Sequence, residues 1–208
     1  MRRIWGRANS SNVMKLVWLL ELLGIPYERI DVGGPFGGTD TGAYRTMNPN
    51  QKVPTLEEED GFILWESNAI LRYLASTCAG GEAFWPVNIR ERANVDRWMD
   101  WQQCTVDAPQ RVLLQGLVRT PPAQRDQVAL DRASAELRRW WALLNDEVSR
   151  KPFVAGEAFT LADIALGVHV HRWFAYDIEK PEMPALKAWY ARLLASPVYR
   201  SKVALPVV

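Results

Sequence analysis

Two short stretches of this chain carry groups that could together hold an extended peptide. The first is residues 51–56, with the sequence QKVPTL, in which a proline opens an apolar run typical of a strand. Proline has no N–H, so it is tolerated at the first residue of a strand but poorly inside one. We therefore expect the backbone of Val53 to lie outside the sheet, where a ligand could pair with it as an added strand.

The second stretch is the pair Glu66 and Ser67, which precedes apolar residues at helical spacing. The N–H groups that open a helix bind anions, so a ligand carboxylate could lie beside Ser67. The carboxylate of Glu66 could bind an ammonium group of the same ligand. A strand edge, a hydroxyl, a carboxylate and a helix N-terminus should therefore meet at one end of a small sheet.

The first third of the chain contains the elements that would position these groups. Residues 3–7 and 27–32 are strand candidates, and a helix with one apolar face separates them. This order predicts a βαβ unit with parallel strands. Strands from Pro54 and from Phe62, followed by the helix from Ser67, would complete a ββα half. Residues 1–78 are thus expected to form a thioredoxin-like βαβ-ββα domain of the α/β class.

The rest of the chain is expected to be all-helical. Glycine and proline residues place a linker at residues 79–88, and no strand pattern follows it. Thr160 and Asp163 form a capping box that marks the start of one helix. The apolar pattern predicts a long helix over residues 89–118, with a kink at Pro109. Three further helices are predicted over residues 130–148, from residue 160, and over residues 185–194. We therefore assign residues 89–208 to an all-α domain.

Composition limits the possible partners. Of the 208 residues, 48% are hydrophobic and 24% are charged, and a formal net charge of +1 gives no reason to expect nucleic acid or an anionic membrane as a partner. The most apolar helix, residues 13–23, is too short to span a bilayer. No apolar segment follows the basic residues near the N-terminus, so we expect no signal peptide.

Cysteine and histidine residues give no sign of a disulfide framework or a metal site. Cys78 and Cys104 form no Cys-x-x-Cys pair, and a reducing cytoplasm is the expected location. We expect Cys104 to be a buried, unreactive thiol, with mixed disulfide formation as the alternative. His169 and His171 are two residues apart on a predicted helix and therefore point to different sides.

The whole arrangement resembles the soluble glutathione transferase family. The sequence NSSNVMK at residues 9–15 is similar to the serine-type theta, delta and bacterial nu classes, and FTLAD at residues 159–163 is similar to the family's capping box. The resemblance implies glutathione as a co-substrate without another cofactor, and a hydrophobic electrophile as the second substrate. It also implies a homodimer, and Phe62 or Tyr73 could join the contact between subunits.

The resemblance also assigns roles to the two stretches. The γ-glutamyl carboxylate of glutathione would lie at Ser67 and the helix N-terminus, and its ammonium at Glu66. The cysteinyl backbone would pair with Val53, before a cis peptide bond to Pro54. The glycyl carboxylate would lie near Lys52. The full set of expected glutathione contacts is Gln51, Lys52, Val53, Pro54, Glu66 and Ser67.

Glutathione chemistry needs the thiolate, and a free thiol of pKa about 8.5 is only about 3% ionised at pH 7. Lowering this pKa by about two units requires about 2.7 kcal/mol. One hydrogen bond to the sulfur, about 1.5–3 kcal/mol, and a helix N-terminus, about 0.3–1 kcal/mol, could supply it. Ser10 falls where theta and delta sequences place their catalytic serine. Asn12, at the nu-class position, is the second candidate, either in place of Ser10 or as its helper, and Ser11 is the third. In the alternative interpretation, all three residues only cap the helix.

The second substrate is expected between the domains, against the long helix. Trp101, Cys104 and Thr105 are the candidate contacts, although most of that stretch is expected to be core. We expect a glutathione transferase that forms a thioether with an electrophile. The alternatives are a glutathione-dependent disulfide or peroxide reductase, and a non-catalytic interaction protein, against which the intact pair Glu66 and Ser67 argues.

Overall fold

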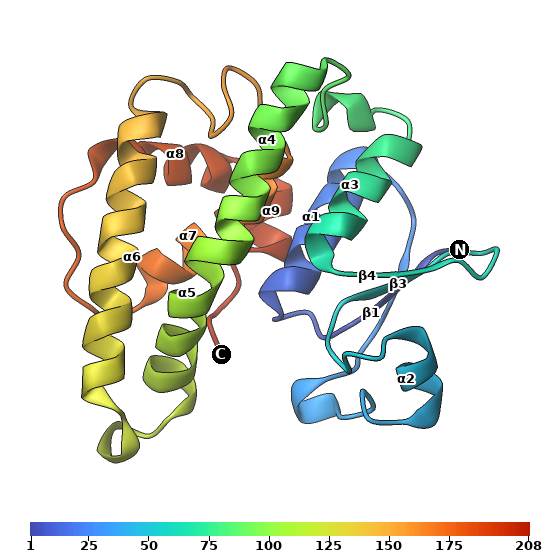
Figure 1. Cartoon of the computed structure of the whole chain (residues 1–208), viewed down its shortest axis with the longest axis horizontal. Coiled ribbons are helices and arrows are strands. Elements are labelled where there is room, and N and C mark those ends of the chain that lie inside the picture. Colours follow the sequence, from blue (N-terminus) through green and yellow to red (C-terminus); the bar gives the residue numbers. More distant parts are fainter. The chain divides into compact units, whose positions relative to one another are not determined.

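The structure, a computed structural model, describes residues 1–208 and contains two units of different construction. The first unit comprises Met1–Trp85 and the segment Val198–Leu205, and the second comprises Pro86–Pro197 and Pro206–Val208. The first combines strands and helices, and the second is helical, as Figure 1 shows for each. The predicted fold class, a thioredoxin-like unit followed by a helical one, is confirmed.

A four-stranded sheet forms the centre of the first unit, in the order β2-β1-β3-β4. The strands are β1 (Arg3–Trp5), β2 (Glu28–Ile30), β3 (Thr55–Glu57) and β4 (Ile63–Trp65). β1 runs parallel to β2 and antiparallel to β3, and β3 runs antiparallel to β4. The predicted parallel βαβ unit and antiparallel ββα half are therefore both present. Each strand is only three residues long, so helices must supply much of the core.

Three helices pack around this sheet. α1 (Ser11–Leu23) and α3 (Ser67–Thr77) lie side by side on one face, and α2 (Gly42–Met47) lies on the other side (Figure 1). Gly24 ends α1 with a φ of 65°, a backbone conformation that glycine adopts without steric cost. The core between sheet and helices consists of fully buried aliphatic side chains, including Ile4, Leu16, Leu20, Leu56, Ile70 and Leu74.

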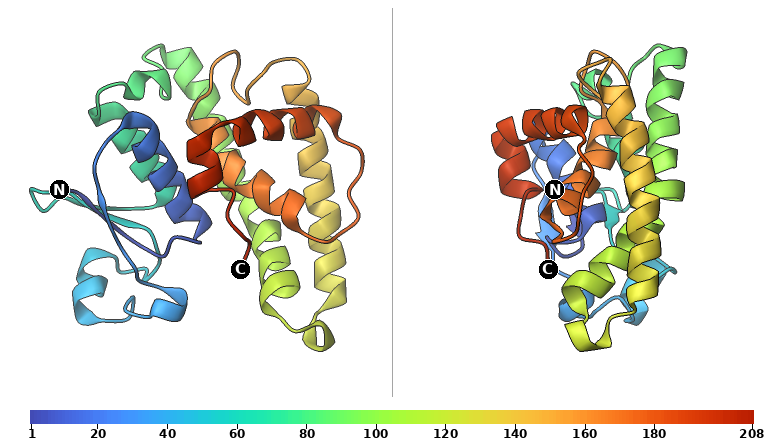
Figure 2. Two further views of the ribbon diagram at one scale, coloured as in Figure 1. Left: turned by 180° about the vertical axis from the view of Figure 1, so that it is seen from behind. Right: turned by 90° about the vertical axis from the view of Figure 1, so that its left-hand side faces the viewer.

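The C-terminal segment returns to the first unit. α9 (Pro197–Lys202) brings the fully buried ring of Tyr199 to 4.7 Å from that of Trp18 in α1, centroid to centroid. Lys202 of α9 forms an ion pair of 2.7 Å with Glu21 of α1. Figure 2 shows α9 beside α1. The thioredoxin-like unit is thus completed by residues from the far end of the chain.

The second unit is built from helices around a core of tryptophan and leucine side chains. Its helices are α4 (Ile89–Trp101), α5 (Asp107–Leu113), α6 (Gln127–Val148), α7 (Leu161–Ala175) and α8 (Pro184–Ala195). Trp141, Trp173 and Trp189 are fully buried between them. No helix of the structure combines the length and the apolar character that crossing a membrane requires.

A π-helical turn accommodates Pro109, where the sequence predicts a kink. Proline lacks the N–H that an α-helix uses, and its ring clashes with the carbonyl four residues earlier. That carbonyl belongs to Thr105, which lies in the π-helical segment Gln102–Val106 between α4 and α5. The N–H of Asp107 bonds to the carbonyl of Gln102, as the wider π turn requires. The helical run therefore continues through the proline.

The predicted capping box is present at the start of α7. The Oδ2 atom of Asp163 accepts from the N–H of Thr160 at 2.9 Å, and the Thr160 hydroxyl oxygen accepts from the N–H of Ala162 at 3.3 Å. Asp163 is fully buried, and its Oδ1 also accepts from the N–H of Val154 and from Trp189 Nε1. This carboxylate therefore joins a loop and two helices, which is more than a helix cap.

Candidate functional site

Two buried side chains fix the backbone just before β3. The hydroxyl of Tyr44 donates to the carbonyl oxygen of Lys52 at 2.7 Å, and Asn48 Nδ2 donates to the same oxygen at 2.9 Å. Both also contact the buried hydroxyl of Thr55, at 3.0 and 3.1 Å. Burial raises the pKa of Tyr44, so its hydroxyl keeps its proton and remains a donor.

This arrangement leaves the backbone of Val53 open. The peptide bond from Val53 to Pro54 is cis, as the family resemblance implies. β3 begins only at Thr55, and neither the N–H nor the carbonyl of Val53 makes a hydrogen bond within the chain. Such a backbone edge offers one donor and one acceptor to an extended ligand.

Glycine at position 6 brings this edge to the start of α1. A Cβ atom on Gly6 would lie 3.1 Å from Val53 Cβ and 2.5 Å from Val13 Cγ2, which is too close for a side chain. Gly6 also has a φ of 154°. The end of β1 therefore approaches both Val53 and the first turn of α1 because it carries no side chain.

Two of the expected contact residues hold a left-handed backbone. Gln51, with φ of 55°, and Glu66, with φ of 72°, are the only non-glycine residues with positive φ in the chain. This conformation costs about 1–3 kcal/mol per residue and concentrates at functional sites. The side chain of Glu66 is exposed, and no hydrogen bond or ion pair within the chain holds its carboxylate.

The start of α3 is bonded directly to α1. The hydroxyl of Ser67 donates to Asn12 Oδ1 at 3.2 Å. The ammonium of Lys15, which has no exposed surface, lies 3.2 Å from Asn68 Oδ1 and 3.5 Å from Ser67 Oγ. Glu66 precedes α3 without a side-chain cap, which leaves the N–H groups of the first turn uncapped by that side chain. Positive charge and N–H dipoles therefore meet at this helix end.

Ser10 precedes α1 without capping it. Its backbone N–H bonds to the carbonyl of Arg7 at 3.2 Å, and its carbonyl accepts from the N–H of Met14 at 2.9 Å. Its side chain makes no capping hydrogen bond and is 7% exposed, whereas Ser11 is half-buried. The bond that the capping alternative requires is therefore absent for Ser10.

The structure thus brings several of the predicted residues together through contacts that the sequence did not reveal. Asn12 meets Ser67, and Gly6 places Val53 beside the first turn of α1. The residues missed by sequence reasoning are Gly6, Lys15, Tyr44, Asn48, Thr55 and Asn68. Lys15 carried a signal, because it is a lysine within an otherwise apolar stretch of helix. The other five residues carried no such signal in the sequence, because the fold determines which residues they contact.

The candidate electrophile contacts lie on the helical run of the second unit. Trp101 is half-buried and packs edge to face against Trp98 at 5.3 Å and against Trp140 at 6.3 Å, between ring centroids. Thr105 is half-buried in the π-helical segment. The three rings form an aromatic cluster in which Trp101 and Trp140 are half-buried and Trp98 is buried.

Cys104 is exposed, so the expectation of a buried thiol is wrong. Gln102 and Val106 are the inward-facing residues of the π-helical segment. Cys104 lies midway between them along the helix and so points away from the core. Free cysteine is usually buried, but position on the helix decides here.

The two histidines make separate contacts. His169 Nε2 lies 3.0 Å from Gln102 Nε2, and His171 Nδ1 lies 2.9 Å from the hydroxyl of Tyr190. The structure contains no group of three or more His, Cys, Asp and Glu residues that could hold a metal ion.

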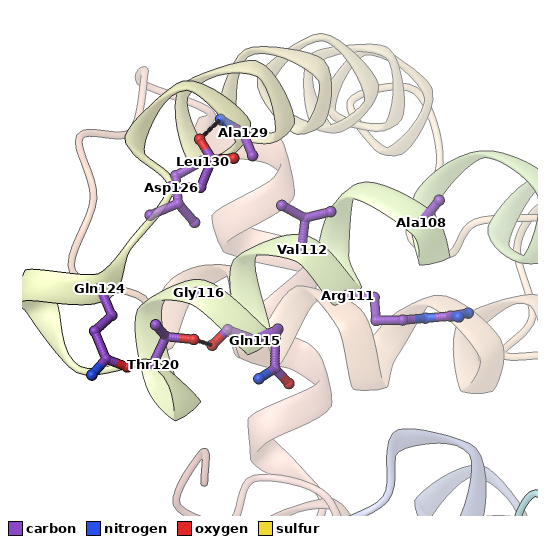
Figure 3. Close-up of a pocket in the computed structure, with 10 residues that line it drawn as sticks. All are labelled: Ala108, Arg111, Val112, Gln115, Gly116, Thr120, Gln124, Asp126, Ala129 and Leu130. Atoms are coloured by element: carbon purple, nitrogen blue, oxygen red, sulfur yellow. Dashed lines mark hydrogen bonds between the residues drawn. The ribbon is translucent and has the colours of Figure 1, made fainter.

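A cavity of about 540 Å³ lies wholly within the second unit (Figure 3). Two of the polar side chains on its wall already make hydrogen bonds, since Thr120 Oγ1 donates to the carbonyl of Gln115 and Asp126 accepts from the Ala129 N–H. None of the predicted site residues lines it. Its lining consists of Ala108, Arg111, Val112, Gln115, Gly116, Thr120, Gln124, Asp126, Ala129 and Leu130.

Comparison with known proteins identifies the family. Residues 9–77 match the family model of the glutathione S-transferase N-terminal domain, and residues 109–197 match that of the C-terminal domain. Over 208 residues, 100% of both chains, the sequence is 40% identical to glutathione S-transferase GstB of Escherichia coli K12. The chain belongs to the glutathione S-transferase family.

Two further relatives of this transferase bear on its class. The theta class glutathione S-transferase from Xanthomonas axonopodis pv. citri, solved with glutathione bound, is 45% identical with a TM-score of 0.95, over 100% of this chain and 99% of that one. Disulfide-bond oxidoreductase YfcG of Escherichia coli K12 is 30% identical over 196 residues, which are 91% of this chain and 89% of the relative. The predicted family and transferase function are therefore confirmed at the level of the family.

Proposed function

We propose that this transferase binds glutathione as an extended peptide along Val53 and ionises its thiol at the start of α1. The observation that carries the proposal is the Ser10 side chain, which lies at the start of α1 and makes no capping hydrogen bond. The open backbone of Val53, brought to the first turn of α1 by Gly6, supports the same position for the peptide.

The ends of glutathione would be held at two places. The γ-glutamyl carboxylate would accept from Ser67 and from the N–H groups that open α3, and its ammonium would meet the unpaired carboxylate of Glu66. The glycyl carboxylate would lie near Lys52 and Gln51, where an exposed, flexible ammonium is sufficient. The left-handed backbone of Gln51 and Glu66 supports these roles, because strained residues gather at binding sites.

Ser10 would act as a hydrogen-bond donor to the sulfur. The hydroxyl and the N-terminus of α1 together stabilise a thiolate, so the thiol proton leaves to solvent without a buried base. Asn12, whose Oδ1 is engaged by Ser67, would be a helper through its amide N–H groups. The thiolate then attacks an electrophilic carbon, a C–S bond forms, and the leaving group departs with its electron pair.

The two domains would supply different parts of the site. Residues 1–78 would hold glutathione and residues 89–208 would supply the electrophile site, with Trp101, Cys104 and Thr105 as contacts. The tryptophan rings around Trp101 suit a hydrophobic electrophile. A homodimer in the cytoplasm, typical of the family, remains part of this prediction.

Disulfide or peroxide reduction through glutathione is the second candidate function. It is favoured by Asn12 and by the likeness to a relative named as a disulfide-bond oxidoreductase. Both functions use the same thiolate and differ in the atom that it attacks, carbon in one case and sulfur or oxygen in the other.

The deciding experiment measures glutathione binding by calorimetry and then turnover with two substrates, a halogenated aromatic compound and a mixed disulfide. Conjugation of the aromatic compound at a rate that Ser10→Ala lowers by at least ten-fold would support the transferase. Turnover of only the disulfide would favour the second candidate. Absence of glutathione binding would contradict both.

A further inference from the structure

Lys15 is the only charged side chain of the first unit that is buried, and it has no exposed surface at all. It lies on α1 among Val13, Leu16 and Val17, which are buried aliphatic residues. An ammonium group is costly to remove from water, so its position needs a compensating role. The glutathione contacts and the thiol chemistry proposed above assign no role to Lys15.

The ammonium is directed at the first turn of α3. Its nitrogen lies 3.5 Å from Ser67 Oγ and 3.2 Å from Asn68 Oδ1, the first two residues of that helix. Ser67 and Asn68 are themselves 3% and 6% exposed, so the contacts are shielded from water. Charge–charge interactions are stronger in such a setting than at an exposed surface.

The direction of the hydrogen bonds gives Lys15 a specific effect on Ser67. An ammonium only donates, so Ser67 Oγ must accept from it and direct its own hydrogen elsewhere. In the structure that hydrogen goes to Asn12 Oδ1 at 3.2 Å. With a carboxylate at the start of α3, the same hydroxyl is oriented to donate to it.

Building on the proposed function, we propose that Lys15 is the positioning residue for the γ-glutamyl carboxylate of glutathione. It orients the Ser67 hydroxyl as a donor and adds a full positive charge to the partial charge of the α3 N-terminus. Lys15 acts from the buried side of the site, through its contacts with Ser67 and Asn68. Its contribution therefore depends on the negative charge of that one ligand group.

The test compares two ligands on the full chain by calorimetry. One is glutathione, and the other is 4-aminobutanoyl-cysteinyl-glycine, which lacks the γ-glutamyl carboxylate and keeps the ammonium and thiol. Wild type should bind glutathione at least about ten-fold more tightly than this analogue. Lys15→Met should lose most of that preference and leave the affinity for the analogue unchanged, while Lys15→Arg should keep part of it.

Steady-state kinetics give a second measurement. Lys15→Met should raise the KM for glutathione about ten-fold and change kcat at saturating glutathione by less than about three-fold. Equal losses of affinity for both ligands, or an unchanged preference for glutathione, would overturn the proposal. Wild type that binds neither ligand would instead contradict the proposed function.

Lys15→Gln guards against a folding defect, because it keeps an N–H donor in the polar cluster without the charge. It should show the same loss of preference as Lys15→Met. If both neutral variants failed to fold while Lys15→Arg folded normally, the charge would serve the fold rather than the ligand, and the proposal would be wrong.

Discussion

Ser67 at the start of α3 donates its hydroxyl hydrogen to Asn12 Oδ1 in α1 across 3.2 Å. Ser67, the proposed contact of the γ-glutamyl carboxylate, is therefore hydrogen-bonded to Asn12, the proposed helper of thiol ionisation. A hydroxyl has a single hydrogen to donate, so Ser67 cannot serve Asn12 and a ligand carboxylate together. Binding of glutathione should thus release Asn12 Oδ1, which couples the two ends of the site.

This coupling predicts non-additive effects in a double-mutant cycle. Ser67→Ala should raise the KM for glutathione about ten-fold, and Asn12→Ala should change kcat by a few-fold. The double variant should differ from the sum of the single effects by about 0.5–3 kcal/mol, the range for residues in contact. The measurement is kcat and KM for all four proteins, and strict additivity would mean that the bond has no role in turnover.

A second prediction concerns Gly6. Gly6→Ala would place a Cβ atom 2.5 Å from Val13 Cγ2 and 3.1 Å from Val53 Cβ, so the Val13 side chain must shift and Val53 must move by a few tenths of an ångström. We expect lower stability and a KM for glutathione raised by at least about five-fold. Gly24→Ala is the matched control, since Gly24 also has positive φ but no atom lies within 4 Å of its added Cβ. Both variants should lose stability, and an equal KM in the two would contradict the prediction.

A third prediction concerns the hydroxyl of Tyr44. Tyr44→Phe removes the donor to the Lys52 carbonyl and should cost about 1 kcal/mol of unfolding free energy. Because this bond fixes the backbone next to Val53, the KM for glutathione should rise by about three-fold or more. Tyr27→Phe is the control, because its hydroxyl bonds to Glu21 and to no residue of the proposed site. A similar rise in KM for the control would show that lost stability alone is the cause.

A fourth prediction concerns the pH dependence of stability. Burial raises the pKa of Asp163 to about 6 from 3.8, although hydrogen bonds from the Val154 and Thr160 N–H groups oppose the shift. Between these values the folded protein holds more protons than the unfolded chain. The stability from this group is therefore complete below about pH 4 and is lost as the pH rises through 6.

Asp163→Asn removes this titration. In urea unfolding, the difference in unfolding free energy, wild type minus Asp163→Asn, should fall as the pH rises from about 4 to about 7. The variant itself should be less stable, because its single amide oxygen cannot accept from the Thr160 N–H and also from the Val154 N–H and Trp189 Nε1. A difference that rises with pH over this range would contradict the prediction.

The parts of the fold that were predicted from sequence rest on local signals. Alternating and helical apolar patterns indicated the βαβ and ββα halves, and Thr160 with Asp163 marked the start of α7 because a capping box involves residues only three apart. The opening residues of α1 and α3 were also recognisable, since polar residues before an apolar helix form a short motif.

The parts that were missed depend on contacts between distant residues. The Lys15 ammonium meets Asn68 from 53 residues away, and Tyr199 packs on Trp18 from the other end of the chain. No local pattern encodes such pairs. The outward position of Cys104 was missed because the expectation rested on the usual burial of free cysteine and not on its place between the inward-facing Gln102 and Val106.

The most direct measurement is a titration of bound glutathione, in which ultraviolet absorbance follows the thiolate over pH in wild type, Ser10→Ala and Ser11→Ala. The proposed mechanism predicts a bound thiol pKa about two units below the free value of about 8.5 in wild type and in Ser11→Ala. In Ser10→Ala, with glutathione still bound, this pKa should return most of the way to the free value. A low pKa that persists unchanged in Ser10→Ala would contradict the central role of this hydroxyl.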